Sequence, residues 1–214
     1  MLTTRLPAPT GRCAIIGAVS VPQPLFYFGA MSPYSWFAAE RIGALLPEAR
    51  WRGVLAGAVF KANGRTSWGL TDERERGIAD CEARAAEHGL GPIRWPDPWP
   101  TSDLTVARAM MHAEALGSLR DFALAAMRLS FLEAADLGEL DAVLEAARRA
   151  GLDPARTGEA IESEAVKQRL RERTDEALDA GVFGVPTILI GEDLYWGDDT
   201  LERAADAFRA FQQL

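Results

Sequence analysis

The stretch LFYFGAMSPYSW, residues 25–36, joins an aromatic run to the start of a helix. Residues 25–29 form a short apolar run that begins directly after Pro24, which predicts a buried strand. Ser32 and Pro33 then begin a helix, because serine is a favoured N-cap residue and proline is favoured at the first helical position. The stretch therefore predicts a strand that leads directly into the N-terminus of a helix.

The other elements follow from apolar periodicity, turn residues and capping residues. They are a strand at 49–55, helices at 71–87, about 103–134, 137–150 and 154–180, a hairpin at 187–196 and a C-terminal helix. Two of these helices are expected to begin with a capping box, formed by Asp136 with Glu139 and by Asp198 or Asp199 with Glu202.

The order of these elements is β-α-β, a long helical block, and β-β-α, which is the thioredoxin topology with a helical insertion. We therefore expect an α/β thioredoxin-like domain made of residues 25–66 and 181–214. Residues 67–180 would form an α-helical insertion. Residues 1–24 are rich in proline and threonine and are expected to be a flexible N-terminal extension.

The composition excludes several classes of function. The 214 residues carry a net charge of -8, which is unfavourable for general binding to nucleic acid or to anionic membranes. No run approaches the roughly 18 apolar residues of a membrane span, so we expect a soluble protein. Cys13 and Cys81 stand far apart and the two histidines are not clustered, which excludes a C-x-x-C motif and predicts no metal site. Cys81 lies between acidic residues that would raise its pKa, so we expect it to be structural.

Residues 32–35, Ser-Pro-Tyr-Ser, are the first candidate for chemistry. In a thioredoxin arrangement a C-x-x-C pair would stand here, and the helix N-terminus would lower the pKa of a thiol. Both cysteine positions are serine, so disulfide exchange by this chain is excluded. Two readings stay open: Ser32 is only an N-cap, or its hydroxyl stabilises a thiolate that a ligand brings.

Val185 and Pro186, directly before the predicted hairpin, are the second candidate. A proline at the first position of a strand is ordinary. Alternatively, the bond between them is cis and leaves the Val185 N–H and C=O available to pair with a bound peptide. Cis bonds are found at only about 5% of X-Pro positions, but the thioredoxin topology favours one here, because this proline faces the N-terminus of the first helix.

Charged and aromatic side chains supply weaker candidates. Lys61 and Arg65 lie in an expected loop after the second strand, where they either hold a carboxylate or are simply solvated. One of Asp198 and Asp199 is expected to cap the last helix, and the other can accept the ammonium group of a peptide-like ligand. Three tryptophans either line an aromatic pocket or serve packing: Trp95, Trp99 and Trp196.

Four motifs resemble a known family when they are taken together: LFYFGAMSPYSW, GAVFKANG, GVFGVPT and LYWGDDTLE. In this order they are similar to 2-hydroxychromene-2-carboxylate isomerases and the related kappa-class glutathione transferases, within the DsbA-like thioredoxin superfamily. The resemblance covers about residues 25–213. Each motif alone is weak, whereas four in register around a helical insertion are specific for the fold.

The resemblance implies a role for six residues. It makes Ser32 the residue that activates glutathione, Val185 with Pro186 the segment that pairs with its cysteinyl backbone, Lys61 part of a glutathione-contacting loop, and Asp198 and Asp199 the residues that hold its γ-glutamyl end. It also implies a reaction in which a glutathione thiolate adds to a small aromatic carboxylate, the adduct rearranges and the thiolate leaves. Glutathione is then a cofactor that is not consumed, and the enzyme is a cytoplasmic homodimer of aromatic catabolism.

Two departures from the family pattern concern the ligands. Gly64-Arg65 stands where relatives usually have Gly-Asn, and Ser102-Asp103 stands where they have Asn followed by Thr or Ser. The resemblance therefore indicates the cofactor more firmly than the substrate. The alternatives are a kappa-like glutathione transferase, which releases a conjugate, and a redox-inactive thioredoxin-like module that binds peptides.

Overall fold

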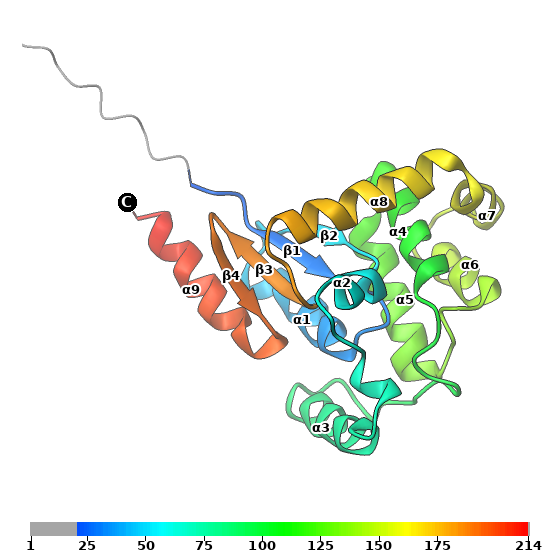
Figure 1. Cartoon of the computed structure of the whole chain (residues 1–214), viewed down its shortest axis with the longest axis horizontal. Helices are drawn as coiled ribbons and strands as arrows, with labels where there is room; N and C mark the ends of the chain where they lie inside the picture. Colours follow the sequence, from blue (N-terminus) through cyan, green and yellow to red (C-terminus); the bar gives the residue numbers. More distant parts are fainter. Residues whose placement is uncertain (1–20, 214) are drawn as a thin grey trace, which may run out of the picture.

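The computed structural model describes residues 21–213, which contain a four-stranded sheet in the order β2-β1-β3-β4 (Figure 1). Parallel pairing joins β1 (Leu25–Phe28) to β2 (Arg50–Gly53), while β3 (Thr187–Ile190) runs antiparallel to both β1 and β4 (Asp193–Trp196). This arrangement confirms the thioredoxin-like α/β fold and the hairpin at 187–196. The second strand is shorter than the predicted 49–55.

Most of the helices lie between β2 and β3 in the sequence. They are α1 (Pro33–Leu45), α2 (Ala56–Ala62), α3 (Arg74–Glu87), α4 (Leu104–Ala115), α5 (Leu119–Glu133), α6 (Leu140–Arg149), α7 (Pro154–Glu162), α8 (Glu164–Asp179) and α9 (Leu201–Phe211), with short 3-10 turns at Trp68–Leu70 and Asp198–Thr200. In Figure 1, α9 lies beside β3 and β4, α4 to α7 gather beyond β2, α8 runs from that group back across the sheet, and α3 lies below α1. The helical block therefore interrupts the thioredoxin-like part between β2 and β3.

β1 is one of the two inner strands, and its side chains are buried on both faces of the sheet. Phe26 and Phe28 are fully buried in the larger core, where their rings stack at 5.2 Å and both contact Trp51 of β2. Tyr27 points to the other face, into a smaller core with Val54. Continuous burial of this kind is typical of a strand covered on both faces, which is why the run LFYF shows no polar alternation.

α1 begins as the sequence predicts. Ser32 is its N-cap, and its Oγ accepts a hydrogen bond from the N–H of Ser35 at 3.2 Å. Pro33 is the first helical residue, where the missing N–H costs nothing. The helix N-terminus therefore stands at a fixed place, one tight turn after the end of β1.

Two predicted helices are each broken in two. The helix predicted at 103–134 ends at Ala115 and restarts at Leu119, because Gly117 has a φ of 74°, which ends a helix. The helix predicted at 154–180 breaks at Ser163, whose Oγ donates to the C=O of Ala160 and accepts from the N–H of Val166. Apolar periodicity continues across both breaks, so the pattern does not show them.

Both predicted capping boxes are wrong. Asp136 accepts hydrogen bonds from Gly138 N–H and the Thr101 hydroxyl, and α6 begins only after Glu139, which makes no side-chain cap. Glu202 does not cap α9 but pairs with Arg41 of α1, and Asp198–Thr200 form a 3-10 turn before the helix. In each case a tertiary partner replaces the local one.

Gly29, at the end of β1, is where three distant segments meet. A Cβ at this position would lie 2.7 Å from the Cβ of Ala56 and 3.6 Å from Cγ2 of Val185. The absence of a side chain lets the start of α2 and the segment before β3 approach the end of β1 closely. This junction places both segments beside the N-terminus of α1.

Residues 1–20 lie outside the described residues, and with them most of the predicted extension and Cys13. Among residues 21–213, no helix combines the length and the apolar character that crossing a membrane requires.

Candidate functional site

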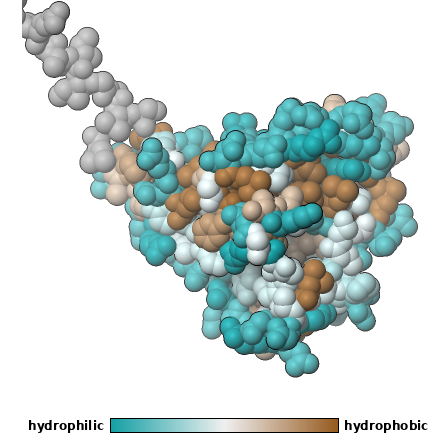
Figure 2. All heavy atoms as spheres, viewed as in Figure 1, coloured by the Kyte–Doolittle hydropathy of each residue, from teal (hydrophilic) through white to brown (hydrophobic). Residues whose placement is uncertain are grey.

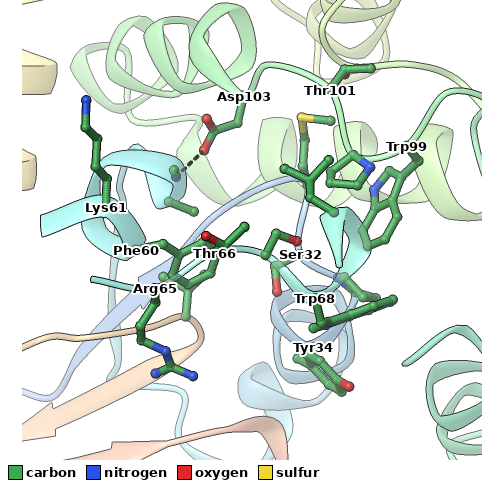
Figure 3. Close-up of a pocket in the computed structure, with 18 of the residues that line it drawn as sticks. Ser32, Tyr34, Phe60, Lys61, Arg65, Thr66, Trp68, Trp99, Thr101 and Asp103 are labelled. Carbon is green, nitrogen blue, oxygen red and sulfur yellow. Dashed lines mark hydrogen bonds between the residues drawn. The ribbon is translucent and has the colours of Figure 1, made fainter. Parts of the chain in front are cut away.

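A cavity of about 370 Å3 opens at the N-terminus of α1 (Figure 3). Its walls come from the start of α1, from α2 and the loop after it, from the connector before α4 and from the segment before β3. Figure 2 shows apolar side chains over the middle of this face, between the hydrophilic surfaces of α8 and α3. The volume and the mostly apolar lining suit a small organic ligand.

Ser32 lies at the base of this cavity and is half-buried. Its oxygen accepts the Ser35 N–H, so its own O–H proton is available to a ligand. The positive end of the α1 dipole points to the same place. The N-cap reading of Ser32 is therefore confirmed, and its geometry also allows it to donate to an anion. Ser35 is buried instead and accepts from the N–H of Gly29 at 3.4 Å, away from the ligand space.

The Val185–Pro186 peptide bond is cis, as the thioredoxin topology predicts. Val185 lines the cavity, and among the described residues its N–H and C=O have no hydrogen-bond partner. Pro186 does not line the cavity, and its C=O accepts the N–H of Gly197 at 3.0 Å. An extended ligand can therefore pair with Val185, while Pro186 sets the direction of that segment.

Lys61 and Arg65 both line the cavity, but Lys61 lies on α2 and not in the expected loop. Within residues 21–213 neither of them pairs with a carboxylate. The guanidinium of Arg65 lies 4.8 Å from the ring of Trp196 and 5.6 Å from that of Phe183, whose C=O it contacts at 3.4 Å. Two cations without a described acid partner thus border the mouth of a mostly apolar cavity.

Asp198 and Asp199 do not line the cavity. Asp198 is 2% exposed, and its Oδ1 accepts from Arg84 at 3.0 Å while its Oδ2 lies 3.6 Å from Nε2 of His88. Burial raises the pKa of Asp198, although the charge of Arg84 opposes this. Asp199 is exposed on the 3-10 turn. The structure therefore separates this acidic pair from Ser32, Lys61 and Val185.

Asp103 is an ionisable residue that lines the cavity, although the sequence did not select it as a site residue. Its Oδ2 accepts the N–H of Gly57 in the first turn of α2, at 3.2 Å. The N-cap residue of α2, Leu55, has no side chain that can cap, so Asp103 supplies the missing acceptor. Burial raises the pKa of Asp103, although hydrogen bonds from backbone N–H groups of α2 act to lower it. The one signal in the sequence was the departure from the family pattern at Ser102-Asp103.

Aromatic rings form the wall opposite the cations. Trp68 and Trp99 line the cavity with their ring centres 5.1 Å apart, and Tyr34 continues the same wall (Figure 3). Trp95 packs behind Trp99 with the ring centres 4.7 Å apart and the ring planes tilted by 60°, and it does not line the cavity. Trp99 and Trp196 therefore line the pocket, and Trp95 serves packing.

Cys81 is fully buried, and burial raises the pKa of its thiol to about 12. The sequence correctly predicted a raised pKa for Cys81, but desolvation by burial raises it more than the charge of the neighbouring Asp80 does. Among residues 21–213 no three His, Cys, Asp or Glu side chains gather closely enough to hold a metal ion.

Comparison with known proteins agrees with this geometry. The family model described as DSBA-like thioredoxin domain matches residues 25–209, which is most of the chain. The chain is a member of this DsbA-like family. Ser32 and Ser35 stand at the start of α1, where a C-x-x-C pair would stand in a thioredoxin arrangement, and the cis Val185–Pro186 bond precedes β3. The resemblance that the four motifs predicted is confirmed.

Two curated relatives of this DsbA-like protein are named 2-hydroxychromene-2-carboxylate isomerase. That of Sphingobium xenophagum is 26% identical over 83% of this chain and 93% of the relative, and that of Pseudomonas putida is 25% identical over 82% and 89%. A solved structure of a 2-hydroxychromene-2-carboxylate isomerase has a TM-score of 0.78 at 21% identity and covers 89% of this chain and 96% of its own. These relatives support an isomerase or a thiol-handling enzyme of the DsbA-like type.

Proposed function

We propose that this DsbA-like protein is a glutathione-dependent isomerase of the 2-hydroxychromene-2-carboxylate type. The observation that carries the proposal is Ser32, a hydroxyl at the N-terminus of α1 that faces an apolar cavity. A thiol at this position would make a redox enzyme, whereas a serine can only assist a thiol that arrives with a ligand. The names of the curated relatives support the reaction type.

The thiol half of the reaction depends on α1 and Val185. A free thiol with a pKa of about 8.5 is mostly protonated at neutral pH, so lowering the pKa by two units raises the thiolate fraction severalfold or more. The Ser32 O–H and the positive end of α1 both favour the anion. The N–H and C=O of Val185 line the cavity without a partner among the described residues, so they are available to pair with the cysteinyl backbone of glutathione.

The substrate half depends on the aromatic wall and the two cations. Trp68 and Trp99 offer ring faces against which an aromatic substrate can stack. Lys61 and Arg65 are available for carboxylates of the substrate or of glutathione. A thiolate held at Ser32 would then add to the substrate, allow rotation about the bond that has become single, and leave again.

The test is turnover of 2-hydroxychromene-2-carboxylate by the purified full chain, with the free thiol measured in parallel. We expect isomerisation that needs glutathione and leaves the concentration of free thiol unchanged. Loss of free thiol in proportion to product would instead indicate a kappa-like transferase. Absence of both, together with peptide binding at Val185, would indicate a redox-inactive binding module.

Replacing Ser32 by alanine tests the thiol half separately. Ser32→Ala should shift the ionisation of bound glutathione to higher pH and lower kcat by at least about tenfold, because the donated hydrogen bond to the thiolate is lost. Ultraviolet absorbance of the thiolate against pH measures the midpoint. Ser67→Ala is the matched control, since Ser67 lines the same cavity and also accepts a backbone N–H, that of Gly69. An unchanged midpoint in Ser32→Ala would contradict the role.

The resemblance extends the proposal to a cytoplasmic homodimer whose small-molecule partners are glutathione and an aromatic carboxylate. Light scattering in solution checks the dimer, for which we expect twice the 23.3 kDa of the chain.

A further inference from the structure

The proposed reaction requires a proton at a place that Ser32 does not reach. When a thiolate adds to a conjugated carbonyl compound, the C=C electron pair moves towards the carbonyl oxygen, which becomes an enolate. Elimination reverses this movement. A positioned acid that gives a proton to that oxygen and later recovers it lowers both barriers, which typically raises the rate by a factor of about 10² to 10⁴.

Few groups around the cavity can exchange a proton in this way. Neither histidine lines it, and Arg65 does not lose its proton in proteins. The hydroxyl of Tyr34 donates to Asp80 at 3.0 Å, and burial raises the pKa of Tyr34. Figure 3 shows the Lys61 amine extending away from Ser32 and from the aromatic wall. The remaining ionisable group is Asp103, which is the one acid among the described lining residues.

The position of Asp103 suits the task. It precedes α4, so it stands on a different wall from Ser32, and it is half-buried in a mostly apolar cavity (Figure 3). The Gly57 N–H holds Oδ2 at 3.2 Å, which fixes the orientation of the carboxyl group and leaves the other oxygen for a ligand. A side chain on Gly57 would crowd this arrangement, because its Cβ would lie 3.2 Å from Oδ1 of Asp103. Burial raises the pKa of Asp103, which favours the protonated form that a general acid needs.

We propose that Asp103 is the catalytic acid and base of the substrate half of this cavity, an inference that rests on the proposed function. As the S–C bond forms, the carboxylic acid of Asp103 gives its proton to the carbonyl oxygen of the substrate, which yields an enol and a carboxylate. After rotation about the C–C bond, the carboxylate takes the enol proton back, the C=C and C=O bonds form again, and the thiolate leaves. The form that reacts is therefore a conjugated aromatic carbonyl compound, which 2-hydroxychromene-2-carboxylate becomes when its cyclic hemiketal opens, and the proton on Asp103 is restored in each cycle.

Asp103 also caps α2, and the test separates the two roles. In Asp103→Asn the amide oxygen can still accept the Gly57 N–H, but the side chain cannot exchange a proton. Asp103→Ala loses both functions. A capping role alone predicts a silent Asn variant and an Ala variant that is destabilised. The acid–base role predicts that both variants lose turnover equally, while only Ala loses stability.

Two reactions are measured with the full chain. One is isomerisation of 2-hydroxychromene-2-carboxylate, and the other is addition of glutathione to benzylideneacetone, an aryl enone that needs the same proton but no isomerisation. We expect Asp103→Asn to lower kcat of both reactions by about 10²-fold or more, with the KM for glutathione and the thiolate midpoint unchanged. The wild-type rate should fall as the pH rises through the pKa of Asp103, because the acid form acts, and this limb should be absent from Asp103→Asn.

The outcomes are distinguishable. If kcat of Asp103→Asn lies within about threefold of the wild-type value, or if the variant keeps the fall in rate at high pH, the acid–base role of Asp103 is overturned and only its capping of α2 remains. A wild-type protein that adds glutathione to the enone without isomerising 2-hydroxychromene-2-carboxylate refutes the proposed function, and the role of Asp103 is then decided by the addition reaction. A wild type that catalyses neither reaction overturns both.

Discussion

At the scale of single residues, Asp198 and Arg84 form an ion pair behind α1 that the sequence does not reveal. Asp198 is almost fully buried, whereas the side chain of Arg84 keeps 30% of its exposure. Burial alone would lower the pKa of Arg84, but the carboxylates of Asp198 and Asp80 raise it. Each charge is therefore tolerated because the other is present.

Removing Arg84 should destabilise the fold. We expect Arg84→Met to lower the free energy of unfolding by about 3 kcal/mol at neutral pH, because it leaves the carboxylate of Asp198 buried without its partner. Burial raises the pKa of Asp198 in the folded state. The free-energy cost of burying its ionised carboxylate therefore appears as the pH rises through that pKa, and protonation relieves the cost at lower pH. Urea unfolding at pH 7 and near pH 4 should therefore give a smaller loss at the lower pH.

The double variant Arg84→Met with Asp198→Asn is the control, because it removes the buried charge together with its partner. It should recover much of the stability and show little dependence on pH in this range. An equal loss at both pH values in Arg84→Met would show that packing of the arginine, and not the charge of Asp198, is what the fold requires.

Residues with a local signature could be predicted, and residues whose role depends on tertiary contacts could not. Ser32 and Pro33 are enough to predict the start of a helix, so the sequence predicted the position of the Ser32 hydroxyl at the N-terminus of α1. Asp198 and Asp199 are adjacent in the chain, yet one is buried against α3 and the other is exposed. Only packing decides which way each carboxylate faces.

At the scale of elements, two glycines that look alike in the sequence have opposite roles. Gly117 ends α4 with a φ of 74°, a conformation that costs any residue with a Cβ about 1 kcal/mol. Gly158 lies inside α7, and a Cβ there would meet Leu144 at an ordinary 3.7 Å. The first glycine is needed where it stands, and the second weakens its helix.

We therefore expect Gly117→Ala to lower the free energy of unfolding by about 1 kcal/mol and Gly158→Ala to raise it by about 0.5–1 kcal/mol. Urea denaturation of the two variants beside the wild type measures both changes. The pair serves as its own control, since the substitution is the same. A gain in Gly117→Ala would mean that α4 and α5 can join as the single helix that the periodicity suggested.

α2 shows why one element was missed altogether. It has only seven residues, contains Gly57 and lacks a capping side chain at Leu55, so its local sequence resembles a loop. Asp103, which follows in a different segment, supplies the acceptor for its first turn. A helix stabilised from elsewhere in the chain leaves no signal in its own residues.

At the scale of the whole molecule, a cluster of charges joins the sheet to the helical block. Glu114 of α4 lies 3.5 Å from Arg52 of β2 and 3.1 Å from Arg173 of α8. Burial and the charge of Arg173 lower the pKa of Arg52, whereas Glu114 opposes this. Glu176 of α8 also pairs with both arginines, at 3.3 Å from Arg52 and 3.2 Å from Arg173, so two carboxylates allow two largely buried guanidinium groups to stand close together.

Glu114→Gln should destabilise the protein by about 2 kcal/mol, because it leaves the more exposed Glu176 as the one described carboxylate that pairs with both arginines. Glu133→Gln is the control: Glu133 pairs with Arg149 on the surface, and exposed pairs contribute little. Thermal and urea unfolding of both variants should show the large effect for Glu114 only. Equal effects would mean that burial of the cluster does not matter.

The order of elements was enough to predict the topology, because β-α-β followed by β-β-α admits few arrangements. The cavity was only partly predictable. Ser32 and Val185 followed from the topology, whereas the aromatic wall and Asp103 depend on how the connector before α4 folds back over α2. That connector has no periodic pattern from which its path could be read.

The pairing of β1 with β3 has a consequence for how the protein is made. The strand LFYF leaves the ribosome before the helical block, but β3, one of its two neighbours, follows only after that block. The helices between them contact one another through nearby segments and can condense while synthesis continues. Until the β3–β4 hairpin is released, one edge of the aromatic strand has no partner, so this edge is where the newborn chain is open to pairing with another chain.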